Sequence, residues 1–281
     1  MRNATPSGTA QPNAAGGAAQ PTSDAAGGAA RLTGRRDGVQ AIARAARVMR
    51  ALAGAPHGMT LAELASAAEL PKSTLHRIVA ALSAEDLLIT DTAGRIALGP
   101  GLVRLGAAGT RAMPALLRPV LETLHREVQE TVDLAVPDGA GMRFTDQLAG
   151  PGRLTTVSAL GARFPMHCTA NGKAYLAALH PERVRALLPA RLERFTTHTI
   201  TSRAALEREL ERVRDTGVAY DREEHTEGIC AVGSVISDGD GPVAAISVPV
   251  PASRFQPRER LYAGAVRSAA GRASEVLSSA S

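Results

Sequence analysis

The chain contains no tryptophan, and aromatic residues make up only 2% of its 281 positions. Hydrophobic residues still account for 44% of the sequence, which is enough to build a folded core. That core must therefore consist mainly of leucine, valine, isoleucine and alanine. The length predicts one large domain or two smaller ones, because domains commonly have about 100–200 residues.

Cysteine and long apolar runs are also scarce. Cys168 and Cys230 are too few for a disulfide framework, and they lack the spacing of a metal-binding cluster. No apolar run approaches the roughly 18 residues that a membrane-spanning helix needs, so we expect a cytoplasmic protein with no membrane partner. The net charge of +5 and the isoelectric point near 9.8 fit a protein that binds a polyanion such as nucleic acid.

The N-terminal segment, residues 1–36, is of low complexity, as in the stretch AAGGAAQPTSDAAGGAA. It contains almost no large apolar side chain, so burial cannot offset the entropy that is lost on ordering. It also lacks the apolar stretch of a signal peptide. We therefore expect residues 1–36 to form a disordered tail, with ordered structure beginning near Asp37.

The next segment, residues 37–99, has the pattern of three helices followed by a β-hairpin. Apolar residues on one helical face predict the first helix: Val39, Ile42, Ala46, Met49 and Leu52. Thr60 and Glu63 form a capping box that predicts a second helix, and Pro71 occupies the expected first position of a third. Two short strands are expected near Leu87–Thr90 and Arg95–Leu98, with an Asp/Gly turn between them.

Two helices joined by a tight turn and followed by a hairpin form a winged helix-turn-helix, a unit that binds double-stranded DNA. The recognition helix of this unit is the one that follows Pro71. Its start enters the major groove, where Ser, Thr and Arg side chains reach phosphates and base edges. A polar helix face alone is more often just solvated, but the ordered combination of these signals favours DNA binding. The candidate contacts are Lys72, Ser73, Thr74, His76 and Arg77 on the helix and Arg95 on the wing.

The remaining sequence predicts a linker helix over 100–113 and a C-terminal domain over 114–281. Helices are expected near 116–129, 169–179, 181–188, 203–216 and 257–278. Strands are expected near 131–136, 142–148, 154–159, 218–220, 229–236 and 243–250. Strands grouped at both ends with helices between them predict an α+β fold for the chain.

Four stretches of sequence together resemble the isocitrate lyase regulator (IclR) family of bacterial transcription factors. They are LAELASAAELPKSTLHRIVAAL, GRIALGPGLVRLG, GARFPMHCTANGKAYLA and EEHTEGICAVGSVISDGDGPVAAISVPVPASRF, within a resemblance that runs from about Val39 to Leu277. The resemblance implies a winged helix, a linker helix and a GAF-like α/β effector-binding domain. It also implies a homodimer or homotetramer, usually a repressor, that responds to a small organic or aromatic acid.

The same resemblance implies where the effector binds. Ala170 and Asn171 match the start of a helix whose backbone amides receive a carboxylate, and Asp221 and Ser247 match positions at the pocket. The family commonly has E-G-x-x-C, but here the cysteine comes one residue early, so Ala231 stands in its place. Because side chains alternate along a strand, Cys230 should point to the other face. The candidate effector-binding residues are Ala170, Asn171, Asp221, Cys230, Ala231 and Ser247.

The stretch PMHCTANGKAYL also contains the residue types of a thiol hydrolase. A catalytic Cys168 would need a base within hydrogen-bond reach, but the adjacent His167 points about 100° away if both lie in a helix. A metal-binding sensor using these two residues with His225 and Cys230 is a second alternative, although no zinc-finger spacing is present. We therefore expect no enzymatic activity, no bound metal and no cofactor.

Overall fold

The computed structural model describes residues 26–55, 57–151 and 158–279. The chain divides into two compact units, Met1–Val103 and Arg104–Ser281, and each is considered by itself. The expected strand over 154–159 falls largely outside the described residues, and Ser158 and Ala159 are not part of a strand.

The first unit contains three helices and a hairpin in the predicted order. They are α1 (Ala26–Ala53), α2 (Leu61–Ala67), α3 (Lys72–Ala84), β1 (Leu88–Thr90) and β2 (Ile96–Leu98). Helix α1 begins well before Asp37, so the expected tail of residues 1–36 is corrected from Ala26 onward, while residues 1–25 lie outside the described residues. Alanines at the start of α1 favour a helix, but Gly27, Gly28 and Gly34 in the same stretch disfavour it, so local composition alone does not explain this start.

The first unit is held together by a small aliphatic core and by the predicted capping box. Thr60 Oγ1 accepts a hydrogen bond from the Glu63 amide, and the Glu63 carboxylate accepts one from the Thr60 amide at 2.8 Å. Gly58 has a φ of 67°, and a Cβ there would lie 2.7 Å from the Ile96 carbonyl oxygen. The buried core residues are Val48, Leu52, Leu64, Ala68, Leu75, Leu82, Leu88 and Ile96.

Helix α4 (Pro100–Val128) is one continuous helix, where we expected a linker helix and a separate helix. It runs through Pro114 and Pro119, each of which removes a backbone donor from the helix. Its C-terminal half places Leu117, Leu121, Leu124 and Val128 in the core of the second unit. The expected break was wrong because this buried apolar face supports the helix through residues with poor local propensity.

The second unit contains an antiparallel sheet with the strand order β5-β4-β3-β8-β7-β6. The strands are β3 (Val132–Asp138), β4 (Gly141–Leu148), β5 (Arg163–Pro165), β6 (Ala219–Arg222), β7 (Ile229–Asp238) and β8 (Gly241–Pro251). The helices after α4 are α5 (Ala170–Ala177), α6 (Pro181–Leu187), α7 (Arg203–Thr216), α8 (Ala252–Phe255) and α9 (Glu259–Ser279), with short 3-10 turns at Met166–Cys168 and Gln256–Arg258. The α+β fold class is confirmed; β5, a three-residue edge strand, was not predicted.

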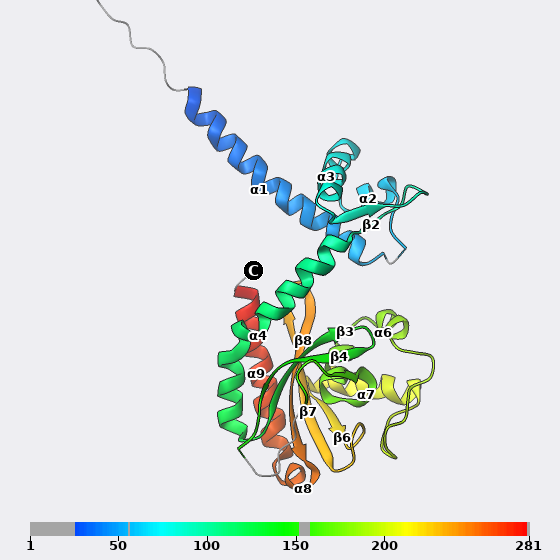
Figure 1. Cartoon of the computed structure of the whole chain (residues 1–281), viewed down its shortest axis with the longest axis vertical. Coiled ribbons are helices and arrows are strands. Elements are labelled where there is room, and N and C mark those ends of the chain that lie inside the picture. The colour runs from blue at the N-terminus through cyan, green and yellow to red at the C-terminus, as the bar shows by residue number, and fades with distance from the viewer. Residues whose placement is uncertain (1–25, 56, 152–157, 280–281) are drawn as a thin grey trace, which may run out of the picture. The chain divides into compact units, whose positions relative to one another are not determined.

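Each face of this sheet is covered by a helical layer, because successive side chains of a strand point to opposite faces. Figure 1 shows α4 and α9 along one face and α6 and α7 on the other. Val132, Leu134, Val232 and Val248 face the α4 and α9 layer. Ala135, Met142, Phe144 and Ala245 face the layer that contains α5, α6 and α7. The second face also carries polar residues, and there a cavity remains.

Candidate functional site

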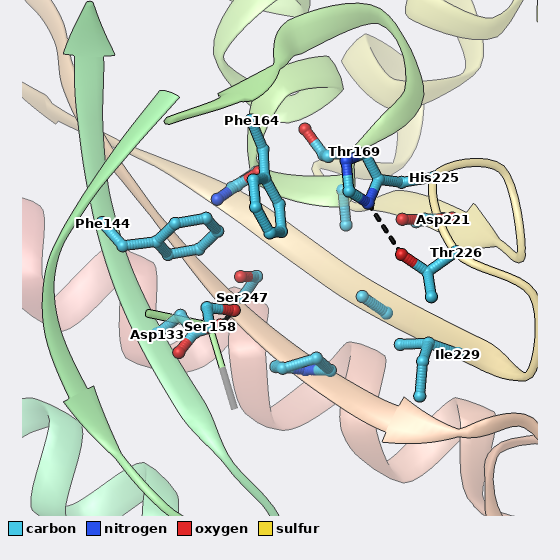
Figure 2. A pocket seen from close by; sticks show the side chains of 14 residues that line it. Asp133, Phe144, Ser158, Phe164, Thr169, Asp221, His225, Thr226, Ile229 and Ser247 are labelled. Carbon is cyan, nitrogen blue, oxygen red and sulfur yellow. Dashed lines mark hydrogen bonds between the residues drawn. The ribbon is translucent and has the colours of Figure 1, made fainter. Parts of the chain in front are cut away.

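A cavity of about 250 Å³ lies between the sheet and the start of α5. Pockets for small molecules usually measure about 300–1,000 Å³, so this cavity suits a small ligand. Figure 2 shows Asp133 and Ser158 at one side of the cavity and Asp221, His225 and Thr226 at the other. The lining residues are Asp133, Phe144, Ser158, Phe164, Thr169, Ala170, Asn171, Asp221, His225, Thr226, Ile229, Ala231, Ser247 and Pro249.

The floor of the cavity is built by strand alternation. Ser247 on β8 lies opposite Asp133 on β3, and Ala231 on β7 lies opposite Asp221 on β6. Pro249 pairs with Ala231, so the two central strands add apolar surface between the polar ends. The register therefore places residues from four strands on one face, beneath the N-terminus of α5.

The N-terminus of α5 approaches the sheet closely because β7 has a glycine beneath it. A Cβ on Gly233 would lie 2.7 Å from the Ala170 carbonyl carbon and 2.8 Å from the Asn171 amide nitrogen. Thr169 caps the helix by accepting a hydrogen bond from the Gly172 amide. The partial positive charge of a helix N-terminus thus faces the cavity, where an anion is favoured.

Asn171 contributes a hydrogen-bond donor that has no partner. Its side-chain oxygen accepts a bond of 2.8 Å from the Gly172 amide. Its side-chain nitrogen Nδ2 has no hydrogen-bond partner among the described residues. Solvent does not supply one readily, because Asn171 is only 2% exposed. An unsatisfied buried donor costs about 1–3 kcal/mol, so a ligand that accepts this bond recovers stabilisation that the empty protein lacks.

Asp133 is the acidic group at the first end of the cavity. Its carboxyl oxygens accept bonds from Gln147 Nε2 at 2.7 Å and from Ser158 Oγ at 2.8 Å. The residue is 1% exposed. Burial raises the pKa of Asp133 to about 7, in spite of the two hydrogen bonds, which act in the opposite direction.

Asp221 is the acidic group at the other end. Its carboxylate accepts a bond of 2.7 Å from the Glu224 amide. Burial and then the nearby charge of Glu224 raise the pKa of Asp221 to about 7. The neighbouring cation, Lys173, does not line the cavity: it is fully buried and pairs with Glu224 and, at 3.4 Å, with Glu209.

Aromatic rings form the upper wall. The His225 ring stacks on Phe164 with centroids 4.3 Å apart, and Phe195 stacks on His225 at 5.2 Å. Phe144 meets Phe164 edge to face at 5.0 Å. Burial lowers the pKa of His225, and the charge of His167 adds to the effect. The wall is therefore apolar and favours a neutral imidazole at neutral pH.

The structure brings most of the predicted effector residues together. Ala170, Asn171, Asp221, Ala231 and Ser247 all line the cavity. Cys230 does not: it lies in the opposite core with Val232 and Val250, so it is removed from the candidate set. The one-residue displacement of the cysteine moved it to the other face of β7.

Several lining residues escaped the sequence reasoning. Asp133 carried a usable signal, since an acidic residue within an otherwise apolar strand indicates a special environment. Ser158, His225 and Thr226 come from loops, and nothing in their local sequence indicates that they converge. Phe144 and Phe164 resemble ordinary core residues until the cavity is seen.

Neither chemical alternative gains support from the geometry. Burial raises the pKa of Cys168 far above its usual value, so the reactive thiolate is scarcely populated at neutral pH. His167 Nε2 is hydrogen-bonded to the Glu193 carbonyl oxygen at 2.9 Å. Across the described part of the chain, no three His, Cys, Asp or Glu residues are placed to hold a metal ion.

The candidate DNA-reading residues lie at the start of α3 in the first unit. Lys72, Ser73, His76 and Arg77 are exposed, and Thr74 is half-buried. Pro71 is the N-cap rather than the first helical residue, and no side chain caps the helix. The α3 amides thus remain available to a phosphate.

Arg95 is placed differently from the other DNA candidates. Its guanidinium donates to the His57 carbonyl oxygen at 2.9 Å and to the Gly58 carbonyl oxygen at 2.6 Å, and it lies 3.8 Å from Glu63. The side chain therefore fastens the wing to the turn before α2.

None of the described helices has both the length and the apolar character required to cross a bilayer.

Comparison with protein families gives two matches that together span most of the described chain. Residues 41–92 match the IclR helix-turn-helix domain. Residues 108–275 match the C-terminal domain of the bacterial transcriptional regulator IclR.

Characterised proteins match over most of both chains. The transcriptional regulator Rv1719 of Mycobacterium tuberculosis is 48% identical over 83% of this chain and 90% of its own length. The regulator TtgV of Pseudomonas putida is 37% identical over 79% of this chain and 85% of its own. The transcriptional repressor IclR of Escherichia coli is 31% identical over 77% of this chain and 82% of its own.

Solved structures have the same fold. The IclR protein of Thermotoga maritima covers 87% of this chain and 99% of its own, with a TM-score of 0.58 and 26% identity. An IclR homologue of Microbacterium hydrocarbonoxydans in complex with 4-hydroxybenzoate covers 86% of this chain and all of its own, with a TM-score of 0.56 and 24% identity.

Proposed function

Because the chain belongs to the IclR family of DNA-binding transcriptional regulators, we propose that it represses its target genes until a small organic acid occupies the pocket. Its C-terminal domain is the effector-binding domain of that family, and the protein is a regulator rather than an enzyme. The chemical class of the effector and the sign of regulation are our proposal.

We infer the chemical class of the ligand from an unpaired hydrogen-bond donor at the N-terminus of α5. Asn171 Nδ2 is buried without a partner, and the helix start at Ala170 presents backbone amides to the same cavity. An acid places a carboxylate there and gains hydrogen bonds together with the helix dipole. The apolar wall of Phe144 and Phe164 suits the remainder of such a molecule.

The DNA side of the proposal is supported by α3. Lys72 and Arg77 are exposed, so both can reach phosphates or bases. Arg77 in the major groove is suited to a bidentate contact with guanine, and Lys72 to a phosphate. Ser73, Thr74 and His76 extend the same surface, whereas Arg95 contributes through its support of the wing.

Relatives support the proposed sign and ligand. A characterised relative is named a transcriptional repressor, and one structure of the same fold is a complex with 4-hydroxybenzoate, an aromatic acid. We extend both features to this chain as parts of the proposal.

We further propose that the functional unit is a homodimer or homotetramer on a palindromic operator. A dimer brings two recognition helices to successive major-groove faces, about 34 Å apart. We assign DNA binding to residues 37–99, effector binding to 114–281 and the connection to 100–113. Helix α4 contains this connection and continues into the effector-side core, so it provides a helical route for the signal.

A two-step experiment tests this proposal. A thermal-shift screen of small organic acids on the full-length protein identifies ligands, and DNA selected by the protein supplies the operator. Each ligand is then added to a gel-shift titration, where it should weaken operator binding by at least about fivefold, the lower end of typical allosteric couplings. Operator affinity that stays unchanged while an acid is bound in the C-terminal domain would contradict the proposal.

A further inference from the structure

The pocket is an unusual site for an anion because it has a carboxyl group at each end and no strong cation in its lining. Asp133 and Asp221 lie on opposite sides of the cavity in Figure 2. Their strands, β3 and β6, are separated by β8 and β7, which places their backbones roughly 14 Å apart at about 4.8 Å per strand. None of the described lining residues is lysine or arginine.

The two acidic ends differ in how their charge is supported. Asp221 accepts a backbone bond from Glu224, and the buried ammonium of Lys173 acts on it from behind the lining. Asp133 is bonded to two neutral donors, the Gln147 amide and the Ser158 hydroxyl. A buried carboxylate with neutral partners is costly, and it either binds a proton or attracts a donor.

The other charged groups around Asp133 do not supply that donor. On β4, Asp146 is paired with Arg118 of α4 at 2.6 Å, and so belongs to the opposite layer. His225, on the loop after β6, lies at the far side of the cavity in Figure 2. Strand β8 contributes the Ser247 hydroxyl, and the part of α5 that lines the cavity has no ionisable side chain.

The hydrogen-bonding capacity of Asp133 is also incompletely used. A carboxylate offers about four lone-pair positions, and the described structure fills two of them. Asp133 is only 1% exposed, so little of it is open to solvent, but it lines the cavity, where an effector group would lie next to it. Whatever group an effector brings to this end therefore meets a carboxyl group directly.

We propose that Asp133 determines effector specificity through a hydrogen bond between its carboxyl group and the effector. The proton of this bond must come from one partner: from the effector or from Asp133. An ionised Asp133 selects an effector that donates a hydroxyl or amino hydrogen at this end. A protonated Asp133 instead donates to a carbonyl or other acceptor. This inference rests on the proposed function, because it concerns the second end of the acid that Asn171 binds.

This requirement links ligand choice to pH. Burial raises the pKa of Asp133 to about 7, so both states are accessible near neutrality. As the pH rises through this value, the carboxyl group loses its proton and an acceptor-bearing effector loses its partner. Its affinity then falls by up to about tenfold per pH unit, whereas a hydroxyl-bearing effector keeps its bond to the carboxylate.

Matched ligand pairs measure the effect on full-length protein. The first pair is 4-hydroxybenzoate, which brings a donor, and 4-formylbenzoate, which brings an acceptor of similar size. The second pair is 3-hydroxybenzoate and 3-formylbenzoate. Dissociation constants are measured by calorimetry from pH 6.0 to 8.5, and each pair gives the ratio of the formyl to the hydroxyl constant. Ionisation of Asp221 or His225 that affects both members alike cancels in this ratio.

The ratio should rise by at least about tenfold over this range in the wild type, because the pKa lies within it. In Asp133→Asn the ratio should be independent of pH, since an amide both donates and accepts without titrating. Asp146→Asn, on the opposite face of the sheet, is the matched control and should keep the wild-type dependence.

The outcomes separate this inference from the proposed function. Probes that bind with a pH-independent ratio overturn the role of Asp133 and leave the proposed ligand class standing. A dependence that persists in Asp133→Asn also overturns it, because another group then holds the proton. If no probe of either pair binds the wild type at any pH, the proposed class of small aromatic acid fails and this inference fails with it.

Discussion

At the scale of single residues, the pocket is defined by polar groups that the fold buries without full compensation. Asn171 keeps an unpaired donor, and Asp133 and Asp221 keep carboxyl groups in surroundings that favour their neutral forms. Such groups lower the stability of the unliganded domain, and a suitable ligand reduces that cost. The position of these residues, more than their number, makes the cavity a binding site.

The first residue-scale prediction concerns stability and pH. Because burial raises the pKa of Asp133 to about 7 in the folded state, the folded chain binds this proton more tightly than the unfolded chain. The contribution of Asp133 to stability is therefore largest below the unfolded pKa of about 4 and is lost as the pH rises through 7. Asp133→Asn should flatten the fall in the free energy of unfolding between pH 5 and 7, by about 1.4 kcal/mol per pH unit at most.

Urea denaturation at pH 5, 6, 7 and 8 measures this change. Asp215→Asn, on the exposed surface of α7, is the control and should leave the wild-type slope in place. Asp221, whose pKa is also raised to about 7, should leave part of the slope in place in Asp133→Asn. A slope in Asp133→Asn as steep as that of the wild type would show that Asp133 does not titrate in this range.

The second residue-scale prediction concerns the donor on α5. Asn171→Leu removes the unpaired Nδ2 group and should weaken binding of the acid by at least about tenfold, since bonds to charged groups contribute about 1.5–3 kcal/mol. Binding to operator DNA without effector should be unchanged. Asn171→Asp keeps an acceptor for the Gly172 amide and should also lose the acid, because it places a negative charge beside the carboxylate. Wild-type acid affinity in both variants would remove Asn171 from the site.

At the scale of elements, the sequence predicted what local pattern and periodicity control. The capping box at Thr60 and Glu63 predicted the start of α2, and strand alternation correctly separated Cys230 from Ala231. The sequence did not predict that α4 continues through Pro114. Burial of the apolar face that contains Leu117 and Leu121 outweighs the low helix propensity of this stretch. The convergence of Asp133, Ser158 and His225 on one cavity depends on strand order and loop paths, which local sequence does not contain.

An element-scale prediction tests the contact between α5 and β7. Gly233→Ala should shift the helix start, because the added Cβ would lie 2.7 Å from the Ala170 carbonyl carbon, which belongs to the backbone. We expect a loss of about 1–3 kcal/mol in the free energy of unfolding, as for overpacked sites, and weaker acid binding. Gly239→Ala is the matched control, since no heavy atom lies within 4 Å of its added Cβ. Equal stability of the two variants would contradict this account of the helix position.

A second element-scale prediction tests α3 as the reading helix. Arg77→Ala should reduce operator affinity by about 1–3 kcal/mol and relax the sequence preference at one base pair. Lys72→Ala should weaken binding to all sequences alike and reduce the slope of the salt dependence by about one. Gel-shift titrations at several salt concentrations measure both effects, and Arg185→Ala on α6 is the control, with a side chain that is 63% exposed. Unchanged specificity in Arg77→Ala would mean that α3 lies elsewhere on the DNA.

At the scale of the whole molecule, two binding events in separate units must influence each other if the effector is to control DNA binding. The chain has a DNA-reading unit and an effector unit, and α4 contains residues of both. A ligand shifts such a system only by its difference in affinity between the DNA-bound and released states. If the effector changes the affinity for the operator by some factor, the operator must change the affinity for the effector by the same factor.

That reciprocity provides the most direct test of the central claim, that the pocket at Asn171 controls the DNA affinity of α3. The affinity of the full-length protein for a labelled operator is measured by fluorescence anisotropy with and without a saturating acid from the screen. The affinity for the acid is then measured with and without operator. Both dissociation constants should rise by the same factor, about 5–150-fold, and Asn171→Leu should abolish the change. An acid that binds the wild type in the C-terminal domain and leaves its operator constant unchanged would contradict this claim.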